Sequence, residues 1–224
     1  MAELDQIMEA LASVWTVKDL RGERILVTAG PTREPFDPVR FITNYSSGKM
    51  GYALAVMALR RGAEVTLISG PSALPVPPGI EFVSVGSARE MRDAVMSHLE
   101  AATVVIKAAA VADYRPAVRA ENKLKKKTGP LLLSLERNPD IIAEVGKKKG
   151  NRVLVGFAME SENLLANARE KLFAKHMDLI VANDLHQEGA GFQCDTNIIK
   201  ILDPRGGVEA VPLMDKLDIA GRIL

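Results

Sequence analysis

Short, wholly apolar runs that alternate with helix-like segments constrain this fold more than any other feature. Ile25–Thr28, Val65–Ile68 and Thr103–Ala110 carry apolar or β-branched residues at most positions, as is typical of strands covered on both faces. The segments between them show helical spacing or helix caps. This β-α-β alternation predicts an α/β protein with a Rossmann-like, three-layer fold and a mostly parallel sheet.

The same patterns place the remaining elements. Further strands are expected at residues 80–85, 131–135, 153–157, 179–182 and 198–202. Helices are expected at residues 48–59, 87–101, 139–148 and 161–175. For the third helix we expect Asn138 as the N-cap, Pro139 at the first helical position and Asp140 as a first-turn acid.

The length of 224 residues allows one large domain or a domain with an appendage. Hydrophobic residues make up 47% and charged residues 25%, as in ordinary globular proteins. Apolar residues recur at helical spacing until the segment Lys18–Gly22 breaks the pattern. We therefore expect residues 1–22 to form a linker or helical lead-in and residues 23–224 to form the main domain.

Charge and hydropathy exclude several classes of partner. The formal net charge of +1 gives no global field that would gather nucleic acid. The apolar stretch Met50–Leu59 is about half as long as a membrane span, and the acidic start of the chain is unlike a secretory signal. The single Cys194 suits a reducing compartment. We expect a cytoplasmic protein without a membrane or nucleic-acid partner.

Two familiar nucleotide motifs are incomplete. The segment Ala29–Arg33 follows the first strand but lacks the three glycines of a dinucleotide fingerprint. The segment Ser46–Lys49 resembles half of a P-loop, but Thr43 stands where the first glycine belongs. An atypical dinucleotide-dependent oxidoreductase therefore stays open on fold analogy alone, as does a non-catalytic nucleotide-binding module.

A candidate anion site lies at the beginning of the first core helix. There, free backbone N–H groups and the helix dipole favour a phosphate or carboxylate. Its candidate contacts are Ser46, Ser47, Gly48 and Lys49. The alternative is an N-cap followed by close helix packing through Gly48 and Gly51.

Two basic segments could also hold anions. The loop Gly30–Arg40 carries three prolines and two arginines, and arginine can grip a carboxylate or phosphate with two parallel hydrogen bonds. Residues 115–127 carry six basic residues against Glu121, which is compatible with a cationic flap over a polyphosphate. The alternatives are a stiff surface loop with exposed ion pairs and a solvated loop.

The fourth strand ends in small residues that reach Asp113. In open α/β sheets, ligands bind at the carboxyl ends of the strands, where small side chains permit close approach. Asp113 could accept hydrogen bonds from sugar hydroxyls, or it could serve as an N-cap or an ion-pair partner.

Taken together, these segments resemble the phosphopantothenate–cysteine ligase family of coenzyme A biosynthesis. The resemblance runs from about Arg24 to the C-terminus and is carried by Thr28–Pro35, Asp37–Arg40, Asn44–Gly51 and Ala109–Tyr114. It implies a ligase that joins 4′-phosphopantothenate to L-cysteine with CTP, through a 4′-phosphopantothenoyl-cytidylate, and releases pyrophosphate and CMP. It also implies a requirement for Mg²⁺, which the triphosphate would hold.

The resemblance further implies a homodimer, with the site near the subunit interface and smaller C-terminal strands used in dimerisation. In bacteria such a ligase usually follows a flavin-dependent decarboxylase in one bifunctional chain. The lead-in at residues 1–22 resembles the connector between those halves. The resemblance is thus compatible with fusion to such a decarboxylase in the native gene, which the residues themselves leave open.

Site residues follow from the resemblance, position by position. Asn44 would hold the acyl group, Arg40 and Ala110 would line the phosphopantothenate site, and Lys123 would contact the nucleotide phosphates. Asp113 would bind the nucleotide. The other implied nucleotide contacts are Lys107, Ala108, Ala109, Pro139, Asp140, Ile141, Ile142, Phe157, Lys171 and Lys175.

Overall fold

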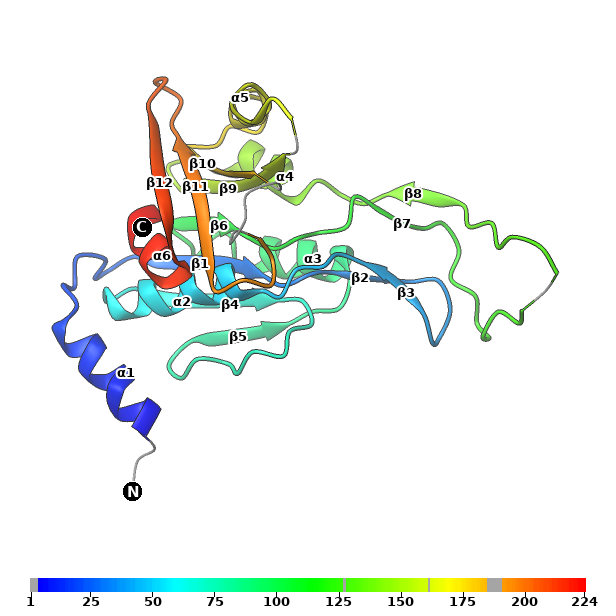
Figure 1. Ribbon diagram of the computed structural model, residues 1–224, viewed down its shortest axis with the longest axis horizontal. Helices are drawn as coiled ribbons and strands as arrows, with labels where there is room; N and C mark the ends of the chain where they lie inside the picture. Colours follow the sequence, from blue (N-terminus) through cyan, green and yellow to red (C-terminus); the bar gives the residue numbers. More distant parts are fainter. Residues whose placement is uncertain (1–3, 127, 161, 185–190) are drawn as a thin grey trace.

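The computed structural model describes residues 4–126, 128–160, 162–184 and 191–224. Their main feature is one central sheet. Within these ranges eight strands pair in the order β12-β11-β10-β9-β6-β1-β4-β5 (Figure 1). Their bounds are β1 Arg24–Ala29, β4 Glu64–Ser69, β5 Glu81–Ser84, β6 Val104–Lys107, β9 Val153–Glu160, β10 Leu179–Asp184, β11 Thr196–Leu202 and β12 Val208–Asp215.

The sheet is parallel from β5 through β10, and only β11 and β12 add antiparallel pairs at one edge. The predicted strand at 25–28 forms β1, which pairs with β4 on one side and β6 on the other. Its residues Ile25 to Ala29 are buried, because the strand lies in the middle of the sheet. The predicted mostly parallel sheet is confirmed.

Helices cover both faces of this sheet, which confirms the three-layer architecture. On one face, α2 (Lys49–Arg60) and α6 (Lys216–Ile223) share a hydrophobic core with side chains such as Ile25 and Val65. On the other face, α3 (Ala88–His98), α4 (Ile141–Lys148) and α5 (Leu164–Ala174) pack against side chains such as Leu26 and Leu154. Alternate residues of each strand therefore serve opposite cores.

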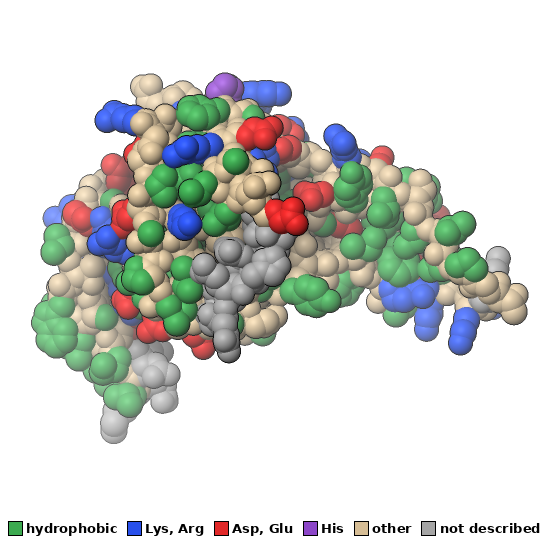
Figure 2. Space-filling model, turned by 45° about the horizontal axis from the view of Figure 1, so that its top comes forward, with side chains coloured by type: hydrophobic (Ala, Val, Ile, Leu, Met, Phe, Trp, Pro, Cys, Tyr) green, Lys and Arg blue, Asp and Glu red, His purple; other side chains and the backbone are tan. Residues whose placement is uncertain are grey.

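A long projection, which we call the arm (residues 33–43, 114–126 and 128–137), extends from one end of the sheet (Figures 1 and 2). It contains two short antiparallel pairs: β2 (Arg33–Pro35) with β3 (Phe41–Thr43), and β7 (Tyr114–Pro116) with β8 (Leu135–Arg137). At the other end of the molecule, α1 (Leu4–Trp15) keeps most of its apolar side chains exposed and pairs Glu9 with Arg60 of α2.

Two local predictions are wrong. The strand expected at 131–135 is not part of the central sheet, because Leu131 and Leu132 are exposed on the arm and pairing begins only at β8. The N-cap of α4 is Asp140, whose Oδ1 accepts the Ala143 N–H at 3.2 Å. Asn138 instead donates its side-chain amide to the carbonyl of Ala112 at 2.8 Å.

The last strand and the last helix were not expected from the sequence. Most β12 side chains are exposed, and Pro212 interrupts its pattern. A proline in a strand is typical of a sheet edge, which is where β12 lies. Among the described residues, no helix is both long and apolar enough to cross a membrane.

Candidate functional site

Two adjacent cavities open at the carboxyl ends of the parallel strands. The larger has a volume of about 450 Å³ and the smaller about 140 Å³. Phe157 on β9 lines both cavities. The chain that leaves β6 separates them, with Lys107 in the larger cavity and Ala108, Ala109 and Ala110 in the smaller. This is the end of the sheet at which open α/β folds bind ligands.

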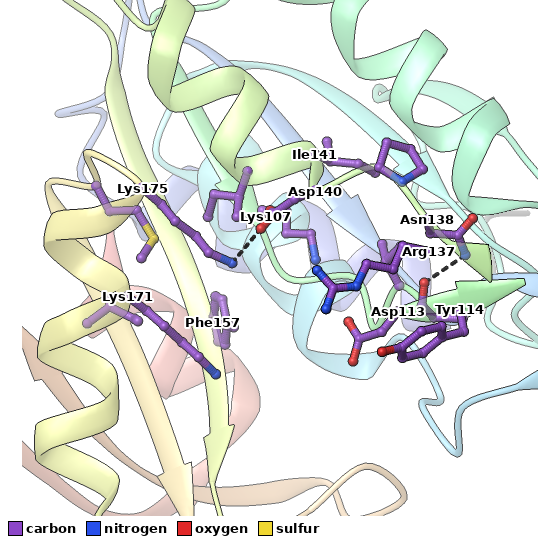
Figure 3. Close-up of a pocket in the computed structure, with 16 residues that line it drawn as sticks. Lys107, Asp113, Tyr114, Arg137, Asn138, Asp140, Ile141, Phe157, Lys171 and Lys175 are labelled. Atoms are coloured by element: carbon purple, nitrogen blue, oxygen red, sulfur yellow. Dashed lines mark hydrogen bonds and ion pairs between the residues drawn. The ribbon is translucent and has the colours of Figure 1, made fainter. Parts of the chain in front are cut away.

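The larger cavity brings together residues from several segments of the chain (Figure 3). Lys107 comes from β6, Asp113 from the loop that follows it, and Phe157 from β9. Lys171 and Lys175 come from α5 and its C-cap. The turn before α4 and its first residues supply Pro139, Asp140, Ile141 and Ile142. These are sequence-predicted nucleotide contacts, and the fold collects them in one space.

Charge in the larger cavity is predominantly positive. Lys175 Nζ lies 2.9 Å from Asp140 Oδ2. Burial alone would raise the pKa of Asp140, but hydrogen bonds from Lys175 and from the Ala143 N–H bring it below its ordinary value. Burial, followed by the charge of Lys175, lowers the pKa of Lys107 to about 8. The cavity therefore suits an anion that compensates its ammonium groups.

Arg137 is a residue of the larger cavity that the sequence analysis did not select. Figure 3 shows its side chain directed into the cavity, beside Lys107 and Asp113. Its position is fixed by β8, where it pairs with Tyr114 across the arm. The available signal was its place immediately before the Asn138–Asp140 turn, which the sequence analysis treated only as a helix start.

The smaller cavity lies at the beginning of α2. Ser46, Ser47, Gly48 and Lys49 all line it, as do Ala108, Ala109 and Ala110. Gly48 has φ +86°, in the left-handed region that glycine adopts readily. The Ser46 hydroxyl accepts the Gly48 N–H at 3.3 Å. The turn therefore aims small polar groups and backbone at the space where the sequence predicts an anion.

Three polar residues of the smaller cavity were missed: Asn183 on β10, Asn197 on β11 and Lys216 on α6. All three are buried. Burial and the nearby charge of Lys49 lower the pKa of Lys216. No sequence pattern indicated Lys216, because the last helix itself was not expected.

Asn44 lies beside the chain segment that separates the cavities. Its Nδ2 donates to the carbonyl of Ala110 at 2.7 Å, and the Ala110 N–H donates to Gly30 at 2.9 Å. These bonds join three of the segments that carry the family resemblance. Asn44 thus lies next to Ala110, as the predicted acyl site requires, although it lines neither cavity.

Arg40 and Lys123 lie together on the arm and line neither cavity. The Arg40 guanidinium donates to Asp37 Oδ2 at 3.1 and 2.6 Å and to the carbonyl of Leu124 at 3.0 Å. This guanidinium, with backbone N–H donors, holds the pKa of the buried Asp37 far below its usual range. Lys123 is exposed beside Leu124. Lys127, the last basic residue of the expected flap, lies outside the described residues.

Within the described ranges, no group of three or more His, Cys, Asp or Glu side chains is placed to hold a metal ion. The described part of the chain thus offers Mg²⁺ no dedicated set of protein ligands.

A family profile and the curated relatives of this chain point to the same family. A profile of the DNA/pantothenate metabolism flavoprotein C-terminal domain family matches residues 20–224. The chain is 51% identical over 210 residues to the coenzyme A biosynthesis bifunctional protein CoaBC of Bacillus subtilis (strain 168), a match that covers 93% of this chain and 52% of that protein. Identity to the CoaBC protein of Escherichia coli (strain K12) is 45% over 219 residues, covering 96% and 53%.

Among solved structures, the chain is similar to the C-terminal domain of a coenzyme A biosynthesis bifunctional protein CoaBC. The identity is 44% and the TM-score 0.79, and the match covers 92% of this chain and 94% of that one. The chain spans about half the length of the curated relatives it matches. The likeness thus concerns the C-terminal half of those proteins.

Proposed function

This chain belongs to the DNA/pantothenate metabolism flavoprotein C-terminal domain family, and we propose that it joins 4′-phosphopantothenate to L-cysteine at the expense of CTP. The observation that carries the proposal is the pair of adjacent cavities. One is rich in cations and the other lies at a helix start, and only the chain from Lys107 to Ala110 separates them. A nucleotide that reaches from the larger cavity to the beginning of α2 would meet the acid at this strand end.

The proposed reaction has two displacements. The carboxylate of 4′-phosphopantothenate attacks the α-phosphorus of CTP, the bond to the bridging oxygen breaks, and pyrophosphate leaves. The amine of L-cysteine then attacks the acyl carbon of the cytidylate, loses a proton, and CMP leaves. Formation of the mixed anhydride converts a poor leaving group into a good one, so the protein chiefly positions reactants and stabilises charge.

Each part of the site has a proposed role in this sequence. Lys107, Lys171 and Lys175 compensate the negative charge of the nucleotide in the larger cavity. Asp113, at the rim, accepts hydrogen bonds from the ribose. The Asn44 amide, which the Ala110 carbonyl orients, holds the acyl group for the amine. Mg²⁺ enters with the triphosphate, as part of the co-substrate.

The arm supports a proposal about assembly. Arg40 and Lys123 are implied contacts of the acid and the phosphates, yet both lie on the arm and line neither cavity of their own chain. Exposed apolar side chains also follow the arm: Val39, Phe41, Val118, Leu131, Leu132 and Leu135. We therefore propose a homodimer in which the arm of one protomer completes the site of the other. A role of the C-terminal strands in dimerisation stays a prediction.

Two further proposals concern the cell. We propose that the protein works in the cytoplasm, as expected for an enzyme of coenzyme A biosynthesis. The relatives are named as bifunctional proteins, and we propose that this ligase also works next to a flavin-dependent decarboxylase.

The test is direct incubation with CTP, 4′-phosphopantothenate, L-cysteine and Mg²⁺. We expect release of CMP and pyrophosphate in equal amounts, together with formation of 4′-phosphopantothenoylcysteine, detected by mass spectrometry. Omission of cysteine should leave the acyl-cytidylate bound. ATP in place of CTP tests the nucleotide preference. Saturable NADH binding without CTP binding would favour the oxidoreductase alternative, and CTP binding without pyrophosphate release would favour a non-catalytic module.

A further inference from the structure

Lys216 is a buried lysine that the proposed reaction does not yet use. It is the first residue of α6, is 6% exposed and lines the smaller cavity. Its Nζ donates to the carbonyls of Gly191 at 2.8 Å and Cys194 at 2.5 Å. Its backbone N–H donates to Asp195 at 2.9 Å. A buried ammonium group is costly unless its donors are paired, so these bonds fix Lys216 and residues 191–195 to one another.

Residues 191–195, which we call the brace, reach from Lys216 to the first turn of α2. Lys49 Nζ lies 2.6 Å from Asp195 Oδ1 and donates to the carbonyl of Gln193 at 2.9 Å. The ammonium of Lys49 is therefore engaged by the brace. Lys49 was expected to contact an anion, but in this arrangement it fastens the brace to the helix start.

Two more bonds tie the brace to the turn before α2. The Ser47 hydroxyl donates to the carbonyl of Phe192. Gln193 Nε2 donates to the carbonyl of Tyr45 at 3.0 Å. The brace thus hydrogen-bonds to the turn that follows Asn44. Lys216 in turn hydrogen-bonds to the brace.

A second buried polar side chain lines the space next to the brace. Asn183 is 7% exposed and lines the smaller cavity. An occupant with polar groups could hydrogen-bond its amide, and the N–H groups at the start of α2 favour an anionic one.

We propose that Lys216 is a positioning residue, which through the brace holds the Ser46–Gly48 turn in the shape that receives the phosphate groups of the nucleotide. This inference rests on the proposed function, which supplies the nucleotide. Lys216 acts through the brace because two of the three N–H donors of its ammonium group are committed to carbonyls of that segment. A change at Lys216 should therefore affect binding of the phosphates more than binding of the nucleoside.

The test compares two variants that break the brace at opposite ends. Lys216→Met removes the buried ammonium group, and Asp195→Asn weakens the ion pair at a side chain that is 84% exposed, where folding is not at risk. Lys149→Met is the matched control, because Lys149 pairs with Asp178 at the end of α4 and lines neither cavity. Calorimetry measures the affinity of each protein for inorganic tripolyphosphate and for cytidine, and steady-state assays give KM for CTP and kcat.

We expect both brace variants to bind tripolyphosphate roughly tenfold more weakly and to raise KM for CTP similarly, while cytidine binding and kcat change by less than about twofold. In the double variant, the fold-loss of tripolyphosphate affinity should be smaller than the product of the two single fold-losses, because both changes act through one segment. The control should match the wild type.

Tripolyphosphate binding that is unchanged in both variants, or absent in the wild type, overturns the role of the brace. An equal loss of cytidine and tripolyphosphate affinity also overturns it, since general destabilisation would then explain the result. Failure of the proposed function is a separate outcome. A wild type that binds tripolyphosphate in a brace-dependent way, but releases no CMP with all substrates, retains this inference and loses the ligase reaction.

Discussion

Lys107 is the residue whose chemistry should make ligand binding depend on pH near neutrality. Its pKa is lowered to about 8, so its ammonium charge is present at pH 7 and is lost as the pH rises through about 8. CTP affinity should therefore fall between pH 7 and pH 9, and Lys107→Met should flatten that part of the profile. Calorimetric titrations of both proteins across this range test the prediction, and parallel profiles would contradict it.

The same residue links pH to stability. The pKa of Lys107 lies below its ordinary value of 10.5 in the folded protein, so the unfolded chain binds more protons between about pH 8 and 10.5. The free energy of unfolding contributed by Lys107 should therefore increase across this window. Urea denaturation of the wild type and of Lys107→Met, at pH 7.5 and pH 9.5 with no nucleotide, measures the difference. A smaller increase is expected for Lys107→Met.

Asn44→Asp should separate binding from catalysis. The change keeps the size of the side chain but places a carboxylate beside the Ala110 carbonyl and the proposed acyl site. We expect CTP affinity to stay close to that of the wild type and kcat for ligation to fall roughly a hundredfold. Calorimetry and the CMP assay give the two quantities. Unchanged turnover would remove Asn44 from its proposed role.

Continuous motifs indicated residues that the fold brings close together. Asn44, Ser46, Gly48 and the run Lys107–Ala110 lie around one strand end. Arg137 escaped notice because its direction depends on pairing within the arm, which no local pattern encodes. Their roles in the reaction remain predictions from the family resemblance.

At the scale of elements, α2 packs so closely against β1 that there is no room for a side chain at Gly51. A Cβ atom at Gly51 would lie 2.5 Å from Ala29 Cβ and 3.0 Å from the Thr28 carbonyl oxygen. We expect Gly51→Ala to lower the free energy of unfolding by roughly 1–3 kcal/mol, because the helix must move away from the strand. Ala166→Gly, at an exposed position of α5, serves as the reference variant for an exchange of alanine and glycine within a helix.

Chemical denaturation of the Gly51→Ala protein measures this loss, and a midpoint equal to that of the wild type would show that α2 can shift freely. A shift of α2 would also move the Ser46–Gly48 turn, so tripolyphosphate affinity should fall with stability. The helix thus transmits packing at β1 to the smaller cavity.

Elements were predictable in proportion to their burial. Strands β1 and β4 carry continuous apolar runs because both of their faces are covered. By contrast, β2, β3, β7 and β8 are three residues long and depend on contacts between distant segments. The bond from the Ala120 N–H to the Phe36 carbonyl is one such contact, and it leaves no periodic pattern in the sequence.

For the whole molecule, the position of the arm leads to a test by complementation. If Arg40 serves the partner's site and Asn44 serves its own, Arg40→Ala and Asn44→Asp homodimers should both be impaired. Coexpression should yield mixed dimers with one intact site, and an unbiased mixture should recover about a quarter of the wild-type activity. Recovery no greater than the sum of the two separate homodimers would place Arg40 and Asn44 in the same site.

The shared wall formed by Phe157 has a consequence for inhibitor chemistry. Since one aromatic ring borders both cavities, a fragment bound in each would be separated by little more than the thickness of a side chain. Joining two such fragments with a short linker would make the second attachment intramolecular, at an effective concentration in the millimolar range. Weak compounds could thus yield a tight one without any new contact to the protein.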